Sequence, residues 1–406
     1  MKRFSLLLAV VSLAMFLGSC GGGSSSNTPP SKSSHRAFLS NTYTGNLQIM
    51  DTQNDTTPYT PETTSSSGQL IPGTPVTISA GNSATFLVES PNLSTTAIFD
   101  PSNNTVIFVD NNKETAGNVV GLPGRSSMAL FSPDSAALYV PEHNAPITGN
   151  APGGVTVVDV VNGVVTVTYS VPSATYIALS PSGQYLLVFA DNSDSAFLLD
   201  LKASTIAAVE IPGFARPVNA FFSADNNTAY VLSCGPECGS MAGPPSVSQL
   251  DIPSKTIKAT VAVGGASVGL MNATTLYVAG TPGATGTYDA VNISTMTRLT
   301  ANSVAIGDGT HTTMALAQNN MLYIGASTCA NQTTGCLSVV DVSKSAAVPP
   351  LPPRGNVTGM LAIVGRNTVY VIEGGYLAIY DTTTSQPQQT QVVFSGALYS
   401  VVQVDQ

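Results

Sequence analysis

A four-part pattern recurs eight times along this 406-residue chain and limits its possible folds more than any other feature. Each copy has four short runs rich in Val, Ile, Leu, Tyr and Phe, separated by Gly, Pro, Asn and Asp, as is clearest between Ser127 and Pro172. The third run of each copy ends in an apolar residue followed by Asp or Asn: Met50-Asp51, Val109-Asp110, Val158-Asp159, Leu199-Asp200, Leu250-Asp251, Val291-Asn292, Val340-Asp341 and Tyr380-Asp381. Successive copies lie 59, 49, 41, 51, 41, 49 and 40 residues apart, which is the spacing of a repeat architecture.

The runs themselves predict β-structure. Short segments of β-branched and aromatic residues between turn formers are typical of strands. The sequence contains no amphipathic helix of three turns, and a parallel α/β fold would need such helices for its crossovers. The recurring Asp is interpreted as turn chemistry, because an Asp side chain accepts hydrogen bonds from backbone N–H groups shortly after it.

The first repeat lacks one of the four runs, and the end of the chain contains one additional run. The first repeat starts at its second run, near Arg36, and one unused run, residues 397–404, follows the eighth repeat. Pairing that last run with the first repeat would close a ring without an exposed sheet edge between the termini. The sequence therefore predicts an all-β fold, a β-propeller of eight four-stranded blades forming a single domain over residues 35–406. Seven blades are the alternative if repeats one and two merge.

The first 34 residues are expected to lie outside the domain. Residues 1–19 read as a secretion signal, with Lys2 and Arg3 before an apolar run that is too short to span a membrane. The run ends in Leu-Gly-Ser-Cys, which resembles a bacterial lipobox with Cys20 as the lipidated residue; an ordinary signal peptide is the alternative. Residues 20–34 then form a flexible Gly/Ser/Pro linker. We expect a lipid-anchored protein of the cell envelope, with the outer membrane favoured because Gly21 follows the Cys.

The cysteine count supports this interpretation. There are five Cys, and lipidation of Cys20 leaves two local pairs, Cys234 with Cys238 and Cys329 with Cys336. An oxidising compartment would keep them as disulfides, each stiffening an insertion between a second and a third run. A zinc site is the competing interpretation, but no His accompanies either pair. The sequence predicts no metal and no cofactor.

Charge narrows the class of partner. The formal net charge is −9, and it becomes −11 once Lys2 and Arg3 leave with the signal. An acidic domain without Trp argues against nucleic-acid binding. We expect a monomer whose partners are the membrane, through the lipid, and an anionic ligand, a glycan or an envelope protein.

The repeats resemble the YVTN-type β-propeller repeat of lactonase-like propellers. Phe131-Ser132-Pro133-Asp134 and Leu179-Ser180-Pro181-Ser182-Gly183 match its SPDG turn, and Leu138-Tyr139-Val140 and Leu276-Tyr277-Val278 match its LYVAN strand. The resemblance covers residues 37–404 and is strongest over 127–345. It implies a propeller fold, and it implies hydrolase activity as one possibility, because some propellers with such repeats are lactonases. The absence of Trp excludes a WD-repeat propeller.

The candidate ligand-binding residues lie in the loops between repeats. Arg125, Arg216 and Arg354 each stand just before a first run, and His311 holds the same place before repeat seven. First runs line the axis of a propeller, so these four side chains could meet at one mouth of the channel. Arg suits carboxylate and phosphate groups, which predicts an anion site. The alternative is that each Arg binds backbone carbonyls of a neighbouring blade.

Two functions stay open. A binding or interaction module fits the tether, the stiffened loops and a sequence without GxSxG, HExxH or phosphate-loop motifs. The alternative is a lactonase-like or other hydrolase that uses the same face, with catalytic residues unknown. Glu142-His143 in the repeat-three insertion is an acid–His pair, but adjacent residues on an extended loop usually point apart.

Overall fold

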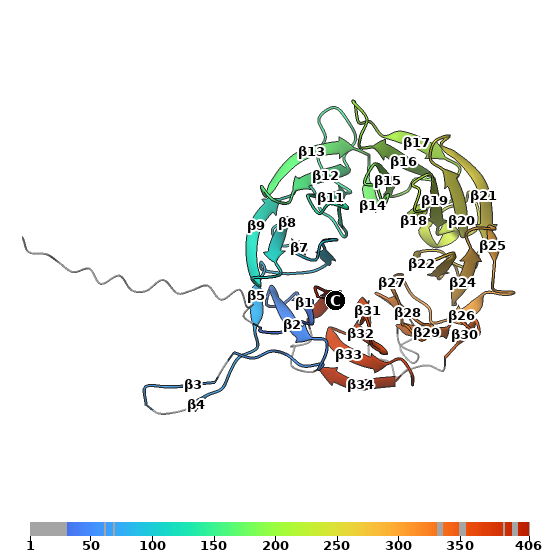
Figure 1. Ribbon diagram of the computed structural model, residues 1–406. Coiled ribbons are helices and arrows are strands. Elements are labelled where there is room, and N and C mark those ends of the chain that lie inside the picture. The colour runs from blue at the N-terminus through green and yellow to red at the C-terminus, as the bar shows by residue number, and fades with distance from the viewer. Residues whose placement is uncertain are drawn as a thin grey trace, which may run out of the picture.

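The computed structural model describes residues 31–60, 62–67, 70–330, 336–348, 355–384, 386–391 and 397–405. Its strands form eight antiparallel sheets arranged in a ring, as Figure 1 shows, together with one small separate hairpin. The predicted all-β propeller is confirmed with eight blades, so repeats one and two do not merge. Each blade corresponds to one sequence repeat, and each recurring Asp or Asn ends the third strand of its blade.

The blades are numbered in chain order, and their strands are given from the axis outward. Blade 1 consists of β35 (Leu398–Gln403), β1 (Arg36–Asn41), β2 (Asn46–Asp51) and β5 (Thr77–Ser79). Blade 2 consists of β6 (Leu87–Glu89), β7 (Thr95–Asp100), β8 (Thr105–Asp110) and β9 (Thr115–Gly121). Blade 3 consists of β10 (Leu130–Phe131), β11 (Ala137–Glu142), β12 (Gly154–Asp159) and β13 (Val164–Ser170). Blade 4 consists of β14 (Ala174–Leu179), β15 (Tyr185–Ala190), β16 (Ser195–Asp200) and β17 (Val209–Pro212).

The second half of the ring repeats this order. Blade 5 consists of β18 (Pro217–Phe222), β19 (Thr228–Ser233), β20 (Ser246–Asp251) and β21 (Thr256–Ala262). Blade 6 consists of β22 (Val268–Asn272), β23 (Thr275–Gly280), β24 (Gly286–Asn292) and β25 (Thr297–Arg298), with β26 (Val304–Ile306) also paired to β24. Blade 7 consists of β27 (His311–Leu316), β28 (Met321–Ala326), β29 (Leu337–Asp341) and β30 (Ala346–Ala347). Blade 8 consists of β31 (Val357–Ala362), β32 (Thr368–Glu373), β33 (Tyr376–Asp381) and β34 (Gln386–Gln391).

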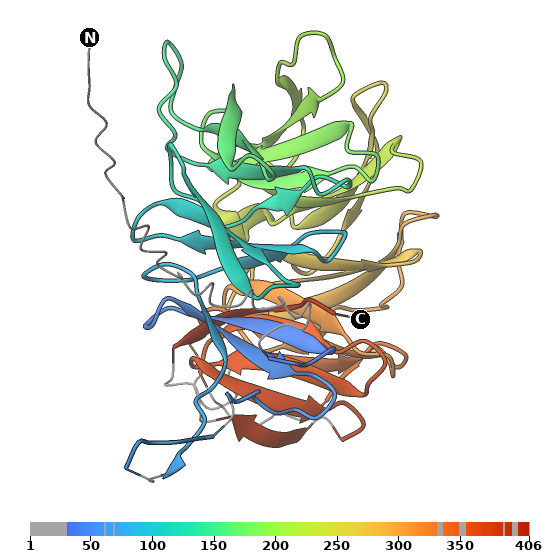
Figure 2. The same cartoon turned by 60° about the vertical axis from the view of Figure 1, so that its left-hand side comes forward.

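Two short elements stand outside the blades. The hairpin β3 (Thr63–Thr64) and β4 (Leu70–Ile71) lies in the long insertion between β2 and β5, and it projects from the ring in Figures 1 and 2. This insertion explains the 59-residue first interval. The 3₁₀ helix η1 (Gly235–Cys238) follows β19, and it is the only helix in the described part of the chain.

Because neighbouring strands are antiparallel, each blade has two distinct ends. The start of a first strand lies opposite the end of the second strand, as in the pairs Pro217↔Ser233 and Val357↔Glu373. Blade-to-blade loops and second-to-third-strand loops therefore share one face of the ring, which we call the loop face. The remaining turns make up the opposite, turn face.

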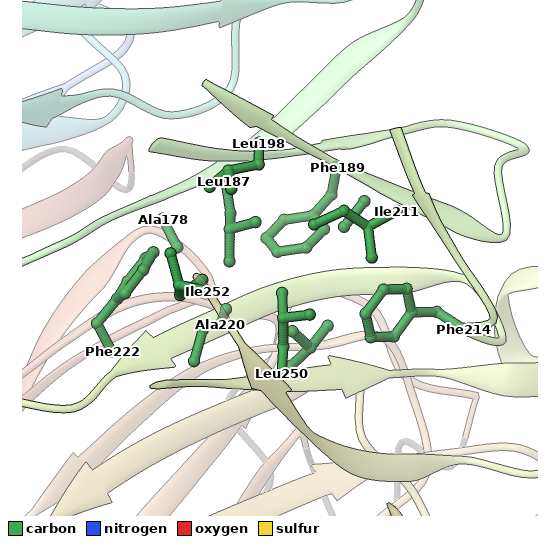
Figure 3. Close-up of a cluster of buried hydrophobic side chains, with 13 residues drawn as sticks. Ala178, Leu187, Phe189, Leu198, Ile211, Phe214, Ala220, Phe222, Leu250 and Ile252 are labelled. Carbon is green, nitrogen blue, oxygen red and sulfur yellow. The ribbon is translucent and has the colours of Figure 1, made fainter. Parts of the chain in front are cut away.

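Packing between blades explains why the second runs are apolar throughout rather than alternating. Every second strand is buried at five or all six of its positions, because a neighbouring blade covers each side of the sheet. The buried apolar residues fall into eight clusters, and each cluster joins two adjacent blades. Figure 3 shows the cluster between blades 4 and 5, where Phe189 and Leu198 face Ala220 and Leu250. The core is thus a closed ring of interfaces.

The ring closes as the sequence predicts. Strand β35 pairs antiparallel with β1, with Phe38 opposite Val402. Arg36, which is buried, also binds two carboxylates: its Nε lies 2.6 Å from Asp405, and its Nη1 lies 2.8 Å from Glu114 of blade 2. One guanidinium therefore holds together the start of the ring, its end and the second blade.

The recurring Asp residues act in turns, as predicted. After β12 the Oδ1 of Asp159 accepts a hydrogen bond from the backbone N–H of Asn162 at 2.9 Å, and Asp381 accepts one from Thr383 at 2.8 Å. The remaining repeat positions accept the same type of bond, at Asp51, Asp110, Asp200, Asp251, Asn292 and Asp341. Their side chains therefore stabilise the turn face.

Candidate ligand-binding site at the channel mouth

The candidate ligand-binding residues divide between two sectors of the loop face. Arg216 and His311 belong to a sector across blades 4 to 7, where an extended set of contacts links the loops. Arg125 belongs to a sector at blades 3 and 4, where polar side chains remain exposed. Arg354 lies outside the described residues.

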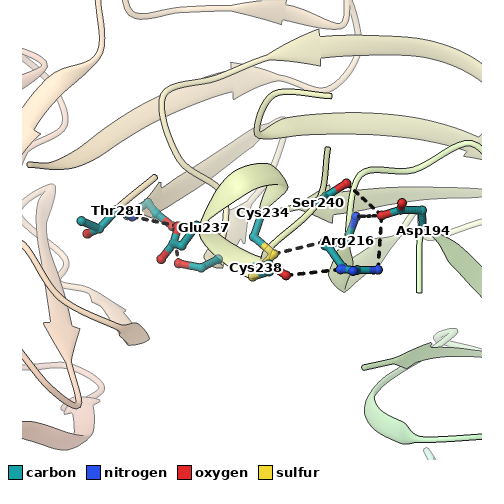
Figure 4. Close-up of a disulfide and its surroundings, with 9 residues drawn as sticks. Asp194, Arg216, Cys234, Glu237, Cys238, Ser240 and Thr281 are labelled. Atoms are coloured by element: carbon teal, nitrogen blue, oxygen red, sulfur yellow. Dashed lines mark hydrogen bonds and ion pairs between the residues drawn. A yellow bond between two sulfur atoms is a disulfide. The ribbon is translucent and has the colours of Figure 1, made fainter. Parts of the chain in front are cut away.

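Arg216 is committed to contacts within the protein. Its Nε donates a hydrogen bond to the carbonyl oxygen of Cys238 at 3.2 Å, and its Nη1 lies 3.6 Å from Asp194 of blade 4. Its backbone N–H also donates to Asp194, at 3.0 Å (Figure 4). The sequence left open the alternative that each loop Arg binds backbone carbonyls of a neighbouring blade. Arg216 does bind a backbone carbonyl, but this carbonyl, of Cys238, belongs to its own blade.

The loop after β19 is fixed by its disulfide. Cys234 and Cys238 are bonded to each other around η1 (Figure 4). Gly235 enters the turn with a φ of +62°, and a side chain there would meet the backbone of Pro245, so this position needs glycine. The predicted pairing Cys329–Cys336 is also present, in the corresponding loop of blade 7. Both disulfides lie in loop-face insertions, as expected.

The disulfide loop also carries a carboxylate toward blade 6. Glu237 accepts a hydrogen bond from the backbone N–H of Thr281 at 2.8 Å, and the Thr281 hydroxyl lies 3.2 Å from Nδ1 of His311 in blade 7. Burial lowers the pKa of His311 to about 4, so its ring is neutral near pH 7. His311 is therefore a buried packing and hydrogen-bonding residue and brings no positive charge to the mouth.

Arg125 is in the opposite situation. Its side chain is exposed, and its guanidinium has no hydrogen bond or ion pair within the described ranges. Its backbone N–H donates to the side chain of Asn144 at 2.9 Å, which holds the 121–126 loop against the insertion after β11. Arg125 thus lies on an anchored loop, and no described carboxylate pairs with its positive charge.

A His–Asp pair lies beside this loop. Nδ1 of His143, in the insertion after β11, is 3.3 Å from Oδ2 of Asp191, in the loop after β15, and both side chains are about half exposed. The backbone N–H of Asp191 donates to the carbonyl of Ser173 at 3.0 Å, which fixes its loop to the start of β14. The pair therefore joins blades 3 and 4 at the mouth, with the Nε2 side of the imidazole left for another partner.

Tyr176 completes the sector. It is exposed on β14, the innermost strand of blade 4, where most neighbours are buried. Partial burial of this side chain and, secondarily, the negative charge of Asp191 raise the pKa of Tyr176. His143 and Tyr176 thus lie near Asp191, and the Arg125 loop, anchored through Asn144, adds a guanidinium without a partner among the described residues to the same sector. Such donors suit an anionic ligand.

Glu142 does not join this sector, as expected for an extended loop. It is fully buried below the loop, beside Gly124, while the next residue, His143, points outward. Burial raises the pKa of Glu142 to about 8, and neither carboxyl oxygen has a well-formed hydrogen bond within the described structure. Sequence reasoning missed the actual partner of His143, which is Asp191.

The described residues contain no group of three or more His, Cys, Asp and Glu side chains that could hold a metal ion. Within the same residues, no helix is long and apolar enough to cross a membrane. The predicted signal, the lipidation site Cys20 and most of the linker lie outside the described residues.

Comparison with known proteins supports the fold alone. No protein-family model matches the sequence, and no curated protein matches it. Among solved structures, a dihydro-heme d1 dehydrogenase, NirN, in complex with DHE is similar with a TM-score of 0.66 at 11% identity, over 91% of this chain and 75% of that one. A functionally unknown protein from Desulfotomaculum acetoxidans has a TM-score of 0.51 at 17% identity, over 78% of this chain and 95% of its own. At such identities the likeness shows a β-propeller and no shared activity.

Proposed function

We propose that this protein is a lipid-anchored envelope protein that binds a small anionic molecule, such as an acidic sugar, at the loop-face mouth between blades 3 and 4. The supporting observation is the exposed guanidinium of Arg125, which has no partner among the described residues and belongs to a loop bonded to Asn144, the residue after His143 of the His143–Asp191 pair. In an acidic protein, an unpaired Arg on an anchored loop favours a carboxylate or phosphate ligand.

Isothermal titration tests the ligand class and the residue together. Galacturonate is the charged probe, and galactose, which is neutral and has nearly the same shape, is its control. We expect galacturonate alone to bind, and Arg125→Ala to weaken it at least tenfold, because a charge-assisted hydrogen bond contributes roughly 1.5–3 kcal/mol. Lys202→Ala removes an exposed cation from the turn face and should leave the affinity unchanged. Equal weakening by both variants, or binding of galactose, would refute the proposal.

The His143–Asp191 pair supports a second candidate, a hydrolase acting on an anionic ester or lactone. A carboxylate on Nδ1 orients the imidazole, so that Nε2 can accept a proton from attacking water. In that case His143→Ala should abolish turnover of an aldaric acid monolactone, which keeps one free carboxylate, while galacturonate still binds. No turnover by the wild-type protein would leave the binding function alone.

The membrane anchor is tested separately. Cys20→Ala removes the predicted acceptor of the lipid, so the variant should no longer incorporate labelled palmitate and should leave the membrane fraction. Cys234→Ala, which alters a disulfide cysteine, is the matched control and should stay membrane-bound. An unlabelled wild-type protein would favour the ordinary signal peptide.

A further inference from the structure

The turn-face end of the channel differs chemically from the loop-face mouth. A hollow of about 440 Å³ lies there, within the roughly 300–1,000 Å³ typical of small-molecule sites. Its lining comes from the last three residues of each of three innermost strands, β22, β27 and β31, which are neighbours in the ring (Figure 1). The position is therefore inside the channel and opposite to the Arg125 sector.

No charged side chain lines this hollow, and most of its lining side chains are apolar. Its residues are Leu270, Met271, Asn272, Met314, Ala315, Leu316, Met360, Leu361 and Ala362. Asn272 is the single polar residue. The three methionines, one from each blade, remain partly exposed although each also packs against an interblade core. Partly exposed apolar side chains that gather in a concavity are a common feature of ligand sites.

Methionine also fits a binding role chemically. Its unbranched thioether side chain adapts to the shape of an occupant and makes favourable contacts with aromatic rings. The volume of the hollow is in the range that holds a small molecule. A charged ligand would find no oppositely charged side chain in this lining.

We propose that this hollow is a binding site for a small uncharged aromatic or apolar molecule, contacted by Met271, Met314 and Met360. The site is independent of the anion site, because the two lie at opposite ends of the channel and share no residue. The protein would thus present a polar mouth on one face and an apolar one on the other.

Fluorescence of N-phenyl-1-naphthylamine, a neutral aromatic probe, tests this site on the whole protein. We expect saturable binding near one probe per chain. Met314→Glu should weaken it at least tenfold by placing a charge in the hollow, and Met314→Leu should keep it. Met241→Glu is the control, because Met241 is almost fully exposed and lies in a loop away from the hollow. Loss of binding in Met314→Leu, or an equal effect of both Glu variants, would contradict the proposal.

Oxidation footprinting keeps the test valid if Met314→Glu folds poorly. In the wild-type protein, the probe should slow peroxide oxidation of Met271, Met314 and Met360 by several-fold and leave Met241 unaffected, as mass spectrometry can measure. Prior oxidation should abolish probe binding, because a sulfoxide is polar. The proposed site would be refuted if the probe shows no saturable binding at concentrations up to about 1 mM, the range of weak binding. It would also be refuted if the probe protects Met241 alone from oxidation.

Discussion

At the scale of single residues, equivalent positions in the repeats have different roles. Arg125 and Arg216 both precede a first strand, yet the guanidinium of Arg125 has no partner among the described residues, whereas that of Arg216 binds Asp194 and Cys238. The difference comes from the neighbouring loops, because the short insertion after β15 brings Asp194 to Arg216. A charge before an innermost strand is therefore a ligand candidate only where the adjacent blade leaves it unpaired.

This contrast predicts opposite stability effects. Arg125→Ala should leave the thermal midpoint nearly unchanged, because surface substitutions without partners usually change stability by less than about 0.5 kcal/mol. Arg216→Ala should lower the stability by about 1 kcal/mol, through the lost hydrogen bond to Cys238 and the weakened contact with Asp194. Urea unfolding of both variants checks this, and equal effects would contradict the division of the mouth into two sectors.

Glu142 predicts a specific pH dependence of stability. Its pKa in the folded protein, about 8, exceeds the value in an unfolded chain, so unfolding releases a proton between those values. The contribution of Glu142 to the free energy of unfolding is therefore fully present below the unfolded-state pKa. It falls by about 1.4 kcal/mol per pH unit as the pH rises toward 8. Glu142→Gln removes the loss, so its stability advantage should grow from pH 5 to pH 8 and then level off. Glu62→Gln, at an exposed position, should show no such trend.

At the scale of elements, the loop after β19 acts as a connector between blades. Through Cys238, Arg216 and Asp194 it reaches blade 4, and through Glu237 it reaches Thr281 in blade 6. A short disulfide holds both contacts in place. The loop thus stabilises more of the loop face than its own blade.

Removing this disulfide should therefore be measurable. Cys234→Ala with Cys238→Ala should lower the stability by about 2 kcal/mol from the loop entropy alone, and further through the released Glu237 contact. Denaturant unfolding gives the loss, and galacturonate affinity should be unchanged because Arg125 lies in the other sector. A stable variant with weakened galacturonate binding would contradict this role.

At the scale of the whole molecule, stability depends on closing the ring. The Arg36 guanidinium is buried against Glu114, which is also buried, and against Asp405, which is partly buried, so Arg36→Met would leave two carboxylates without their cation. We expect a loss of about 3–5 kcal/mol, as for other broken buried pairs. Lys113→Met breaks a pair of similar length, 2.6 Å to Asp110, on an exposed turn, and should cost less than about 1 kcal/mol. Similar losses in calorimetry would mean that Arg36 does not hold the ring closed.

The fold could be predicted from the sequence because its determinants recur in every repeat. Three of these determinants are visible in short stretches of the sequence. They are the Asp that ends each third strand, the apolar second run, and the additional run at the C-terminus. The site could not be predicted fully, because contacts between blades decide which polar groups stay unpaired. One signal was nevertheless present: His143 and Asp191 each directly follow a second strand, β11 and β15, so aligned repeats place them at the same position in adjacent blades.

The most direct test of the proposed mouth is the response of individual arginines to the ligand. In protein labelled with ¹⁵N-arginine, the Nε–Hε signal of Arg125 can be assigned from its loss in Arg125→Lys. We predict that galacturonate shifts this signal in a saturable way and leaves those of Arg216 and Arg366, which are ion-paired with Asp194 and Asp55, unmoved. A shift at Arg216 without one at Arg125, or no shift at any arginine, would contradict the account.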